Sequence, residues 1–266
     1  MLCITIPAHN EEASITQCVA AAIAAGRHDA LNGEQVQVLV VADACSDRTA
    51  MLARRAGATV LVVNNRNVGA ARATGADFAL DHGARWLAFT DADTIVSPDW
   101  LVKQLQCKAD VVCGTVSIDE WHRDAESARL HFLQTYCDVD GHRHIHGANL
   151  GVSAQAYKQA GGFQPLCAHE DVALVRALQA AEATICWSAQ PRVRTSCRLT
   201  SKTGAGFGAT LHRWNHALDV PIAIPVGTSI APLNAREATV REKYFALSVP
   251  TSEHISHIAM SLSTIE

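Results

Sequence analysis

The sequence has no C-x-x-C pair, no internal repeat and no apolar run long enough to cross a bilayer. The longest apolar run near the C-terminus, residues 220–233, is broken by three prolines, whereas a spanning helix needs about 20 apolar residues. The nine cysteines are odd in number, so they cannot all pair within the chain. Met1 leads into a strand-like stretch without the features of a signal peptide. We therefore expect a cytoplasmic protein with reduced thiols and no integral membrane segment.

A basic surface is also missing, because the formal net charge is -4 at pH 7. Nucleic-acid-binding proteins normally carry a basic face, so we expect no nucleic acid among the partners. Apolar residues make up 48% of the chain and charged residues 18%, which is typical of a globular protein. With 266 residues, the chain is long enough to bury a substantial core.

Two hydrophobic periods alternate over residues 1–118. Runs with the character of buried strands are separated by segments in which apolar residues recur with the helical period. The predicted strands are Leu2–Ile6, Val36–Ala42, Thr59–Val63, Arg85–Thr90 and Asp110–Val116, and the predicted helices are Glu11–Ala25, Asp47–Ala56, Gly69–Leu80 and Pro98–Gln106. This alternation predicts an α/β fold, with a mostly parallel, doubly wound sheet and helices on both faces.

The alternation is less regular beyond residue 118. The predicted helices here are Glu126–Cys137, His169–Ala180 and Asn234–Leu247, and the predicted strands are His144–Val152 and short runs near Ile185 and Val193. No low-complexity linker separates these segments from the first part. We therefore predict one domain with a less regular C-terminal third.

Two carboxylates, Asp91 and Asp93, directly follow the apolar stretch Trp86–Phe89. In α/β proteins, ligands bind at the carboxyl ends of the strands. Residues two apart on an extended backbone project to the same side, so both carboxylates can face one ion. Their oxygen atoms suit Mg²⁺ or Mn²⁺ shared with substrate phosphates. A solvated turn is the alternative interpretation of this D-x-D motif.

A series of short motifs surrounds this D-x-D pair. The motifs are P-x-x-N-E at Pro7–Glu11, V-x-D-x-S-x-D-x-T at Val41–Thr49 with Cys45 beside Ser46, N-x-G-x-A-R at Asn67–Arg72, D-x-D at Asp91–Asp93, G-G-F at Gly161–Phe163 and E-D at Glu170–Asp171. Each one alone is compatible with ordinary loop and helix-cap chemistry. In this order they resemble the inverting glycosyltransferases of family 2, which have the GT-A fold and use nucleotide sugars. The resemblance extends from Ile4 to about Arg198.

The resemblance implies a role for each of the N-terminal motifs. The residues of the nucleotide-sugar site would be Pro7, His9, Glu11, Asp43, Arg72 and Asp91. Among them, Asp43 would contact the base, and Arg72 would lie near the base or the diphosphate. Asp91 and Asp93 would bind the Mg²⁺ or Mn²⁺ ion that bridges the diphosphate. A divalent cation suits this place, because it stabilises the negative charge of the leaving group.

An inverting transfer also needs a base that accepts the proton of the acceptor hydroxyl. The resemblance implies Asp171 as this base, with Glu170 orienting the acceptor or its neighbours. Both residues begin a predicted helix whose Leu174 and Leu178 face the core. The alternative is that they are only first-turn acids favoured by the helix dipole.

Three histidines, His142, His144 and His146, alternate in the segment that precedes Gly161. They are open to three interpretations: contacts to a polar or anionic acceptor, plain surface residues, or a second metal site that lacks an obvious fourth ligand. The resemblance places the acceptor site in this region. The implied acceptor-binding residues are His146, Asn149 and Gly162, and the acceptor would be a small molecule, a glycan or a lipid-linked molecule.

Basic residues without a motif follow in the segment 193–216. They include Arg194, Arg198, Lys202, His212 and His216, with Ser196 among them and a glycine-rich stretch at 203–208. Such a stretch is typical of a mobile loop, and its basic groups are candidates for closing over a diphosphate. His212 and His216 would share one helix face. They are either a plain surface pair, which is the favoured interpretation, or candidates for a third metal ligand.

The predicted enzyme is a metal-dependent glycosyltransferase that moves a sugar from a nucleotide diphosphate to an acceptor hydroxyl with inversion. Its predicted parts are a nucleotide-sugar-binding half at 1–118, an acceptor-binding and catalytic half of the same domain at 119–220, and a C-terminal extension at 221–266. One alternative is a nucleotidyltransferase, which would usually have a glycine-rich basic loop where this chain has Pro7–Glu12. The other is a non-catalytic nucleotide-sugar-binding protein, against which the intact Glu170–Asp171 pair counts.

Overall fold

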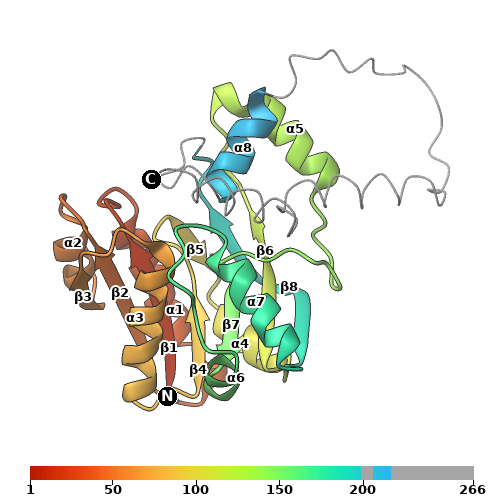
Figure 1. The fold of residues 1–266 in the computed structure, drawn as a ribbon. Helices are drawn as coiled ribbons and strands as arrows, with labels where there is room; N and C mark the ends of the chain where they lie inside the picture. Colours follow the sequence, from red (N-terminus) through yellow and green to blue (C-terminus); the bar gives the residue numbers. More distant parts are fainter. Residues whose placement is uncertain (199–205, 217–266) are drawn as a thin grey trace, which may run out of the picture. The chain divides into compact units, whose positions relative to one another are not determined.

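The computed structural model describes residues 1–198 and 206–216, and Figure 1 shows its fold. The chain divides into two units, Met1–Val220 and Pro221–Glu266, and all the described residues belong to the first. The predicted helix 234–247 and Lys202 therefore lie outside the described residues, as does the first half of the glycine-rich stretch, residues 203–205. None of the helices in the described ranges has the length and apolar character needed to span a membrane.

The described residues are built on one eight-stranded sheet with the strand order β3-β2-β1-β4-β7-β6-β8-β5. The strands are β1 (Leu2–Ala8), β2 (Val36–Asp43), β3 (Thr59–Val63), β4 (Trp86–Phe89), β5 (Thr94–Val96), β6 (Val111–Ser117), β7 (Leu150–Ser153) and β8 (Ile185–Thr195). Strands β1 to β4 pair in parallel, as do β6 and β8, whereas β7 and β5 run antiparallel to their neighbours. The prediction of a mostly parallel sheet is confirmed.

Helices cover both faces of the sheet (Figure 1). They are α1 (Ile15–Gly26), α2 (Thr49–Arg55), α3 (Val68–Asp81), α4 (Trp100–Gln106), α5 (Glu126–Thr135), α6 (Ala154–Gln159), α7 (Glu170–Ala180) and α8 (Phe207–His216), with short 3-10 turns at Asp29–Leu31 and Arg123–Ala125. One core joins α1, α2 and α4 to the face that carries Ile4, and the other joins α3, α6 and α7 to the face that carries Cys3. Successive side chains of β1 point to opposite faces, so this strand contributes to both cores.

Helix α3 lies unusually close to the sheet. A Cβ added at Gly75 would lie 2.3 Å from Cγ2 of Thr5 in β1, so only glycine permits this approach. The helix begins directly after Asn67, whose side chain accepts a hydrogen bond from the N–H of Ala70 at 2.9 Å. The close packing and the capped start together hold Arg72, in the second turn of α3, near the carboxyl edge of the sheet.

Three of the predicted elements differ from the structure. The strand predicted at His144–Val152 is wrong in its first half, because only Leu150–Ser153 forms β7 and the histidines lie in irregular chain. The two short strands near Ile185 and Val193 are one strand, β8, which continues through a register shift relative to β6. Helix α1 begins at Ile15 instead of Glu11, because residue 10 has a left-handed backbone and the residues after it form a turn.

Helices α5 and α8 pack side by side in a third, smaller cluster (Figure 1). Leu211 of α8 is fully buried there against Ala125 and Ala128. Asn215 links the two helices, since its side chain donates to the carbonyl of Asp124 at 2.5 Å and accepts from the N–H of Ala128 at 3.4 Å. This pair follows the ends of β6 and β8, next to the carboxyl edge of the sheet.

Candidate active site

Three adjacent strands deliver polar residues to one edge of the sheet. Strands β2, β1 and β4 are neighbours and run in parallel, so their carboxyl ends meet there. Asp43 ends β2, His9 follows β1, and Asp91 follows β4 after a single intervening residue. The structure thus brings together side chains that are 34 and 48 residues apart in the sequence, as the motif order predicts.

Asp43 organises the chain between β3 and α3. It is 4% exposed, and its Oδ1 accepts from the backbone N–H groups of Asn65 at 2.7 Å and Arg66 at 2.9 Å, while its Oδ2 accepts from that of Asn67 at 2.8 Å. A buried carboxylate needs such partners, since an unbonded one is costly. The side chain therefore fixes one wall of the predicted nucleoside pocket, and its contact with a base stays a prediction.

The turn after β1 is bonded to the turn after β2. Asn10 adopts a left-handed φ of 52°, and its Oδ1 accepts from the N–H of Ser46 at 2.8 Å. His9 is exposed, and its Nδ1 donates to the main-chain carbonyl of Asp43 at 2.7 Å. The imidazole therefore lies at the surface of this edge, where a planar ligand can contact it. Pro7, in contrast, is a buried residue of β1.

Arg72 is a buried cation behind the D-x-D pair. Only 3% of it is exposed, and its guanidinium pairs with Asp91, Nη2 to Oδ1 at 2.5 Å, and with Glu170 through Nη1. The ring of Phe163 lies 5.9 Å from the guanidinium carbon, and Nε has no hydrogen-bond partner among the described residues. Removing Arg72 would leave Glu170 buried without its cation, so we expect Arg72 to hold the Glu170 side chain in place.

Burial perturbs the acidity of the Asp91 carboxyl. Loss of water around it raises its pKa to about 6, and the charges of Asp93 and Asp171 contribute to the rise while Arg72 opposes it. The side chain is nevertheless 39% exposed. A ligand that arrives from solvent can therefore reach this carboxylate on the side away from Arg72.

Asp93 is held by two side chains that follow β8. Its Oδ2 accepts from the hydroxyl of Ser196 at 2.5 Å and is paired with Nη2 of Arg198, whose Nη1 donates to Glu11 Oε1 at 3.0 Å. Burial opposes the charge of Arg198, but Asp93 and Glu11 outweigh this effect and raise the pKa of the guanidinium. Neither Ser196 nor Arg198 belongs to a motif, and the sequence predicts only that basic groups of this segment are candidates for closing over a diphosphate.

Asp171 lies beside Arg72, at the start of α7. Its Oδ2 accepts from the N–H of Gly147 at 2.7 Å, and its Oδ1 accepts from the N–H of Val172 at 2.8 Å. The backbone of Gly147 passes directly against the guanidinium, since a Cβ added there would lie 2.4 Å from Nη2 of Arg72. The structure therefore places the predicted base at the same edge as Asp91.

The three histidines form an aromatic stack with Tyr136. Ring centroids are 4.2 Å apart between Tyr136 and His144, 5.4 Å between His142 and His144, and 5.8 Å between His144 and His146. The Tyr136 hydroxyl accepts from the N–H of Val116 at 2.8 Å and shares a hydrogen bond of 2.9 Å with Nε2 of His146. Sequence reasoning missed Tyr136, since nothing in its neighbours signals a contact with a segment 10 residues away.

Burial keeps these rings neutral near pH 7. It lowers the pKa of His144 to about 4 and that of His146 to about 3, and the neighbouring histidines lower both further. The three histidines therefore do not form a positively charged cluster for an anion. Neutral rings and a tyrosine instead offer apolar faces and a few hydrogen-bonding edges.

Two of the predicted acceptor-binding residues, Asn149 and Gly162, are buried in the protein. Asn149 is fully buried, and its amide donates to the carbonyls of Thr115 at 2.7 Å and Pro191 at 2.8 Å and accepts from the indole of Trp100 at 2.8 Å. The described conformation offers no accessible atom of this side chain to an acceptor. Gly162 is also buried, with a φ of 71° that a side chain would strain. Among the three, His146 alone is partly accessible.

The D-x-D pair fits a divalent cation that is shared with phosphates. In residues 1–198 and 206–216, the second oxygen of Asp91 and that of Asp93 make no hydrogen bond or ion pair, so each carboxylate retains one oxygen for a metal. The same ranges contain no cluster of three or more His, Cys, Asp or Glu side chains suited to a metal ion. Mg²⁺ and Mn²⁺ do not need such a cluster, because they use one or two carboxylates plus substrate oxygens.

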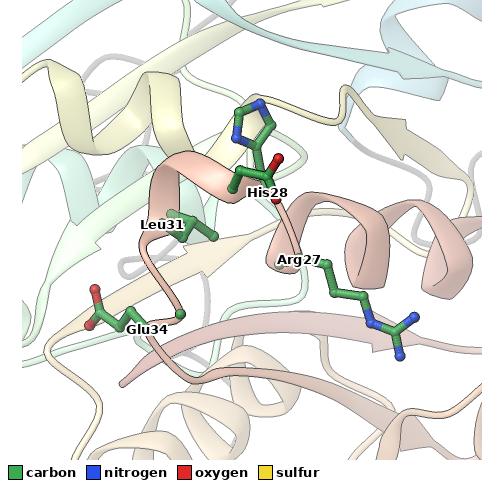
Figure 2. A pocket seen from close by; sticks show the side chains of 7 residues that line it. Arg27, His28, Leu31 and Glu34 are labelled. Atoms are coloured by element: carbon green, nitrogen blue, oxygen red, sulfur yellow. The ribbon is translucent and has the colours of Figure 1, made fainter.

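A separate hollow of about 260 Å³ lies between α1 and β2, lined by residues that include Arg27, His28, Leu31 and Glu34 (Figure 2). It is at the amino end of β2, opposite the carboxyl edge that carries Asp43. The labelled side chains point in different directions, and they do not converge on one centre. This hollow is therefore not part of the candidate site.

The fold is that of known GT-A glycosyltransferases. S. aureus TarS in complex with UDP-GlcNAc superposes with a TM-score of 0.56 and 14% identity, over 84% of this chain and 67% of that one. M. tuberculosis glucosyl-3-phosphoglycerate synthase in complex with Mn²⁺, UDP and phosphoglyceric acid gives a TM-score of 0.52 and 15% identity, over 84% and 80% of the two chains. Another TarS structure is matched over only 40% of its length.

A sequence comparison then identifies the family. The model of "Glycosyl transferase family 2" matches residues 3–161, which is more than half of the 266 residues. The chain belongs to glycosyl transferase family 2. No curated protein sequence matches it. The matched range includes the P-x-x-N-E, N-x-G-x-A-R and D-x-D motifs, and it ends just before the Glu170–Asp171 pair.

Proposed function

We propose that this glycosyltransferase moves a sugar from a nucleotide-diphosphate sugar to an acceptor hydroxyl with inversion, and that it uses Mg²⁺ or Mn²⁺. The observation that carries the proposal is the position of Arg72. This one buried guanidinium joins Asp91 of the D-x-D pair to Glu170 of the E-D pair. The predicted donor site and the predicted base are thereby neighbours, although 79 residues separate these two carboxylates in the sequence.

Asp171 is the proposed base. In an inverting transfer, the acceptor hydroxyl attacks the sugar from the face opposite the diphosphate and gives its proton to a carboxylate. The bonds from Gly147 and Val172 to Asp171 fix the orientation of the side chain, which remains half-buried and partly open to the cleft. Glu170 is 4% exposed and pairs with Arg72 through Oε1, so we assign it the positioning of α7 instead of direct contact with the acceptor.

Asp91 and Asp93 are the proposed metal ligands. When bound, the metal ion supplies positive charge to the diphosphate leaving group. The two carboxylates hold their orientation without it, because Arg72 fixes Asp91 and the Ser196 hydroxyl fixes Asp93. Such preorganisation reduces the rearrangement that the donor must drive on binding.

The nucleoside is expected near His9, in the pocket whose walls are the turn after β1 and the turn that Asp43 fixes. Residues 1–118 would then form the donor half, 119–220 the acceptor half and 221–266 an extension. Tyr136, His144 and His146 suit an acceptor with apolar faces and hydroxyl groups, such as a sugar ring, on a small molecule, a glycan or a lipid carrier. The free thiols of the nine cysteines support a reducing compartment, such as the cytoplasm.

The test is a panel of UDP-, GDP-, dTDP- and ADP-sugars, each with Mn²⁺, Mg²⁺ or EDTA. Thermal shift reports binding, and the release of free nucleotide reports slow hydrolysis of the donor. We expect one nucleotide to stabilise the protein only with metal, and Asp93→Ala to lose this effect. Tight binding without turnover would favour a non-catalytic nucleotide-sugar-binding protein, and no shift with any nucleotide would refute the proposal.

A further inference from the structure

Arg198 forms a bridge across the opening of the D-x-D site. Its guanidinium contacts Glu11, from the turn after β1, and Asp93, from the segment after β4, and these partners are 187 and 105 residues away in the sequence. The Ser196 hydroxyl bonds to the same Asp93 oxygen at 2.5 Å. A cation of the protein itself is thus in direct contact with one of the two proposed metal ligands.

This position has an electrostatic consequence for a metal ion. The positive charge of Arg198 repels a divalent cation at the same carboxylate, because the repulsion between two like charges grows as their distance and the effective dielectric constant decrease. A free metal ion therefore binds Asp91 and Asp93 less well while Arg198 stays on Asp93. A metal ion that is already bound to a diphosphate is repelled less. The phosphate oxygens accept hydrogen bonds from the guanidinium, and their negative charge cancels the repulsion between the guanidinium and the metal ion.

Resting on the proposed function, we propose that Arg198 makes metal binding conditional on the nucleotide: it pairs with Asp93 and Glu11 in the free enzyme, and with the diphosphate when the metal-bound donor enters. Arg198 is then a positioning residue that discriminates between free metal ions and the metal–nucleotide complex. The site would stay closed to free Mn²⁺ and Mg²⁺, and the donor would bring its metal with it.

The exposure of Arg198 is consistent with such an exchange of partners. Its side chain is 30% exposed, compared with 3% for Arg72. Among the described residues, its guanidinium pairs with the side chains of Glu11 and Asp93, and side chains can rotate without breaking backbone structure. Arg72 has no comparable freedom, because it is enclosed by α3, by the backbone of Gly147 and by Glu170.

The experiment compares wild type with Arg198→Gln in the full chain. Arg194→Gln is the matched control, since Arg194 lies on β8 four residues upstream and pairs with the exposed Asp119 at 3.1 Å, away from the D-x-D pair. Two affinities are measured by calorimetry: that for Mn²⁺ alone, and that for the tightest-binding of UDP, GDP, dTDP and ADP in saturating Mn²⁺.

We expect Arg198→Gln to bind free Mn²⁺ about tenfold more tightly and the nucleoside diphosphate about tenfold more weakly, while Arg194→Gln matches wild type in both. Opposite changes are the decisive signature, because simple damage to the site would weaken both affinities. If the affinity for free Mn²⁺ is unchanged or lower in Arg198→Gln while wild type binds a nucleotide with metal, the inference is overturned and the proposed function stands. If wild type binds no nucleotide with any metal, both the inference about Arg198 and the proposed function are refuted.

Discussion

The two sides of the D-x-D pair are built from the same kinds of residue but in opposite ways. On the closed side, defined by Arg72, Gly147, Glu170 and Asp171, an arginine is 3% exposed and confined by backbone. On the open side, defined by Glu11, Ser196 and Arg198, an arginine is 30% exposed, and its partners within the described part of the chain are two carboxylate side chains. An arginine–carboxylate pair can therefore fix a geometry on one side of a site and remain exchangeable on the other, because burial decides how costly its separation is.

The largest expected effect is on the closed side, in the chemical step. Asp171→Asn keeps an oxygen that accepts from the N–H of Gly147 but removes the proton acceptor. Loss of a general base typically costs about 10²- to 10⁴-fold in rate, so we expect a loss of that size in nucleotide release from the donor, with nucleotide affinity close to wild type. The exposed Asp77→Asn on α3 is the control, and near-normal turnover in Asp171→Asn would exclude this residue as the base.

The next effect is on stability. Arg72→Met leaves Glu170 buried without its cation, which typically costs about 3–5 kcal/mol, and we expect chemical denaturation to show a loss of this size in the free energy of unfolding. Adding Glu170→Gln removes the unpaired charge and should restore part of the loss. Arg85→Met is the comparison at an exposed pair, Arg85 with Glu34, where we expect about 1 kcal/mol or less. Equal losses at the two pairs would show that burial does not distinguish them.

The pair of Arg72 and Glu170 also shows how much of the site the sequence could predict. The N-terminal half, with its parallel strands and its P-x-x-N-E, N-x-G-x-A-R and D-x-D motifs, was predictable because regular periodicity and local turns determine it. The partners of Arg72 were not, since Glu170 is 98 residues away and only the tertiary fold brings them together. The stack around Tyr136 and the burial of Asn149 were missed for the same reason: they depend on packing in irregular chain, which has no period to read.

A smaller effect concerns pH and the acceptor side. Since the pKa of His146 is lowered to about 3 and that of His144 to about 4, the folded state resists protonation that the unfolded chain accepts below about pH 6.5. Stability should therefore be full above pH 6.5 and fall as the pH decreases toward 4, by up to about 1.4 kcal/mol per pH unit and histidine. The raised pKa of Asp91 works in the opposite direction between about pH 6 and 4.

The variant His146→Gln separates these contributions. Glutamine keeps an oxygen that accepts from the Tyr136 hydroxyl but cannot be protonated in this range. We expect the free energy of unfolding, measured by denaturant titration from pH 7.5 to 4.5, to decline less steeply than in wild type, with Asp91 unchanged in both. Parallel curves for the two proteins would mean that His146 is protonated in the folded state as readily as in the unfolded chain.

The smallest effect is expected on the open side. Arg198→Gln removes an ion pair that is partly exposed to solvent, and such pairs typically contribute about 1 kcal/mol or less. The melting temperature should therefore change little compared with Arg72→Met. A large loss in Arg198→Gln would remove the difference between the two sides, because it would make Arg198 a structural residue like Arg72.

Gly147 has a consequence for sequence variation at the closed side. Its Cα faces the guanidinium of Arg72 so closely that even a methyl group would overlap Nη2 and the guanidinium carbon. Residue 147 can be no larger than glycine as long as residue 72 is arginine, so the permitted residues at the two positions depend on each other. A saturation library at residue 147, selected for a folded protein, should return almost only glycine, whereas a library on an Arg72→Met background should admit alanine and serine.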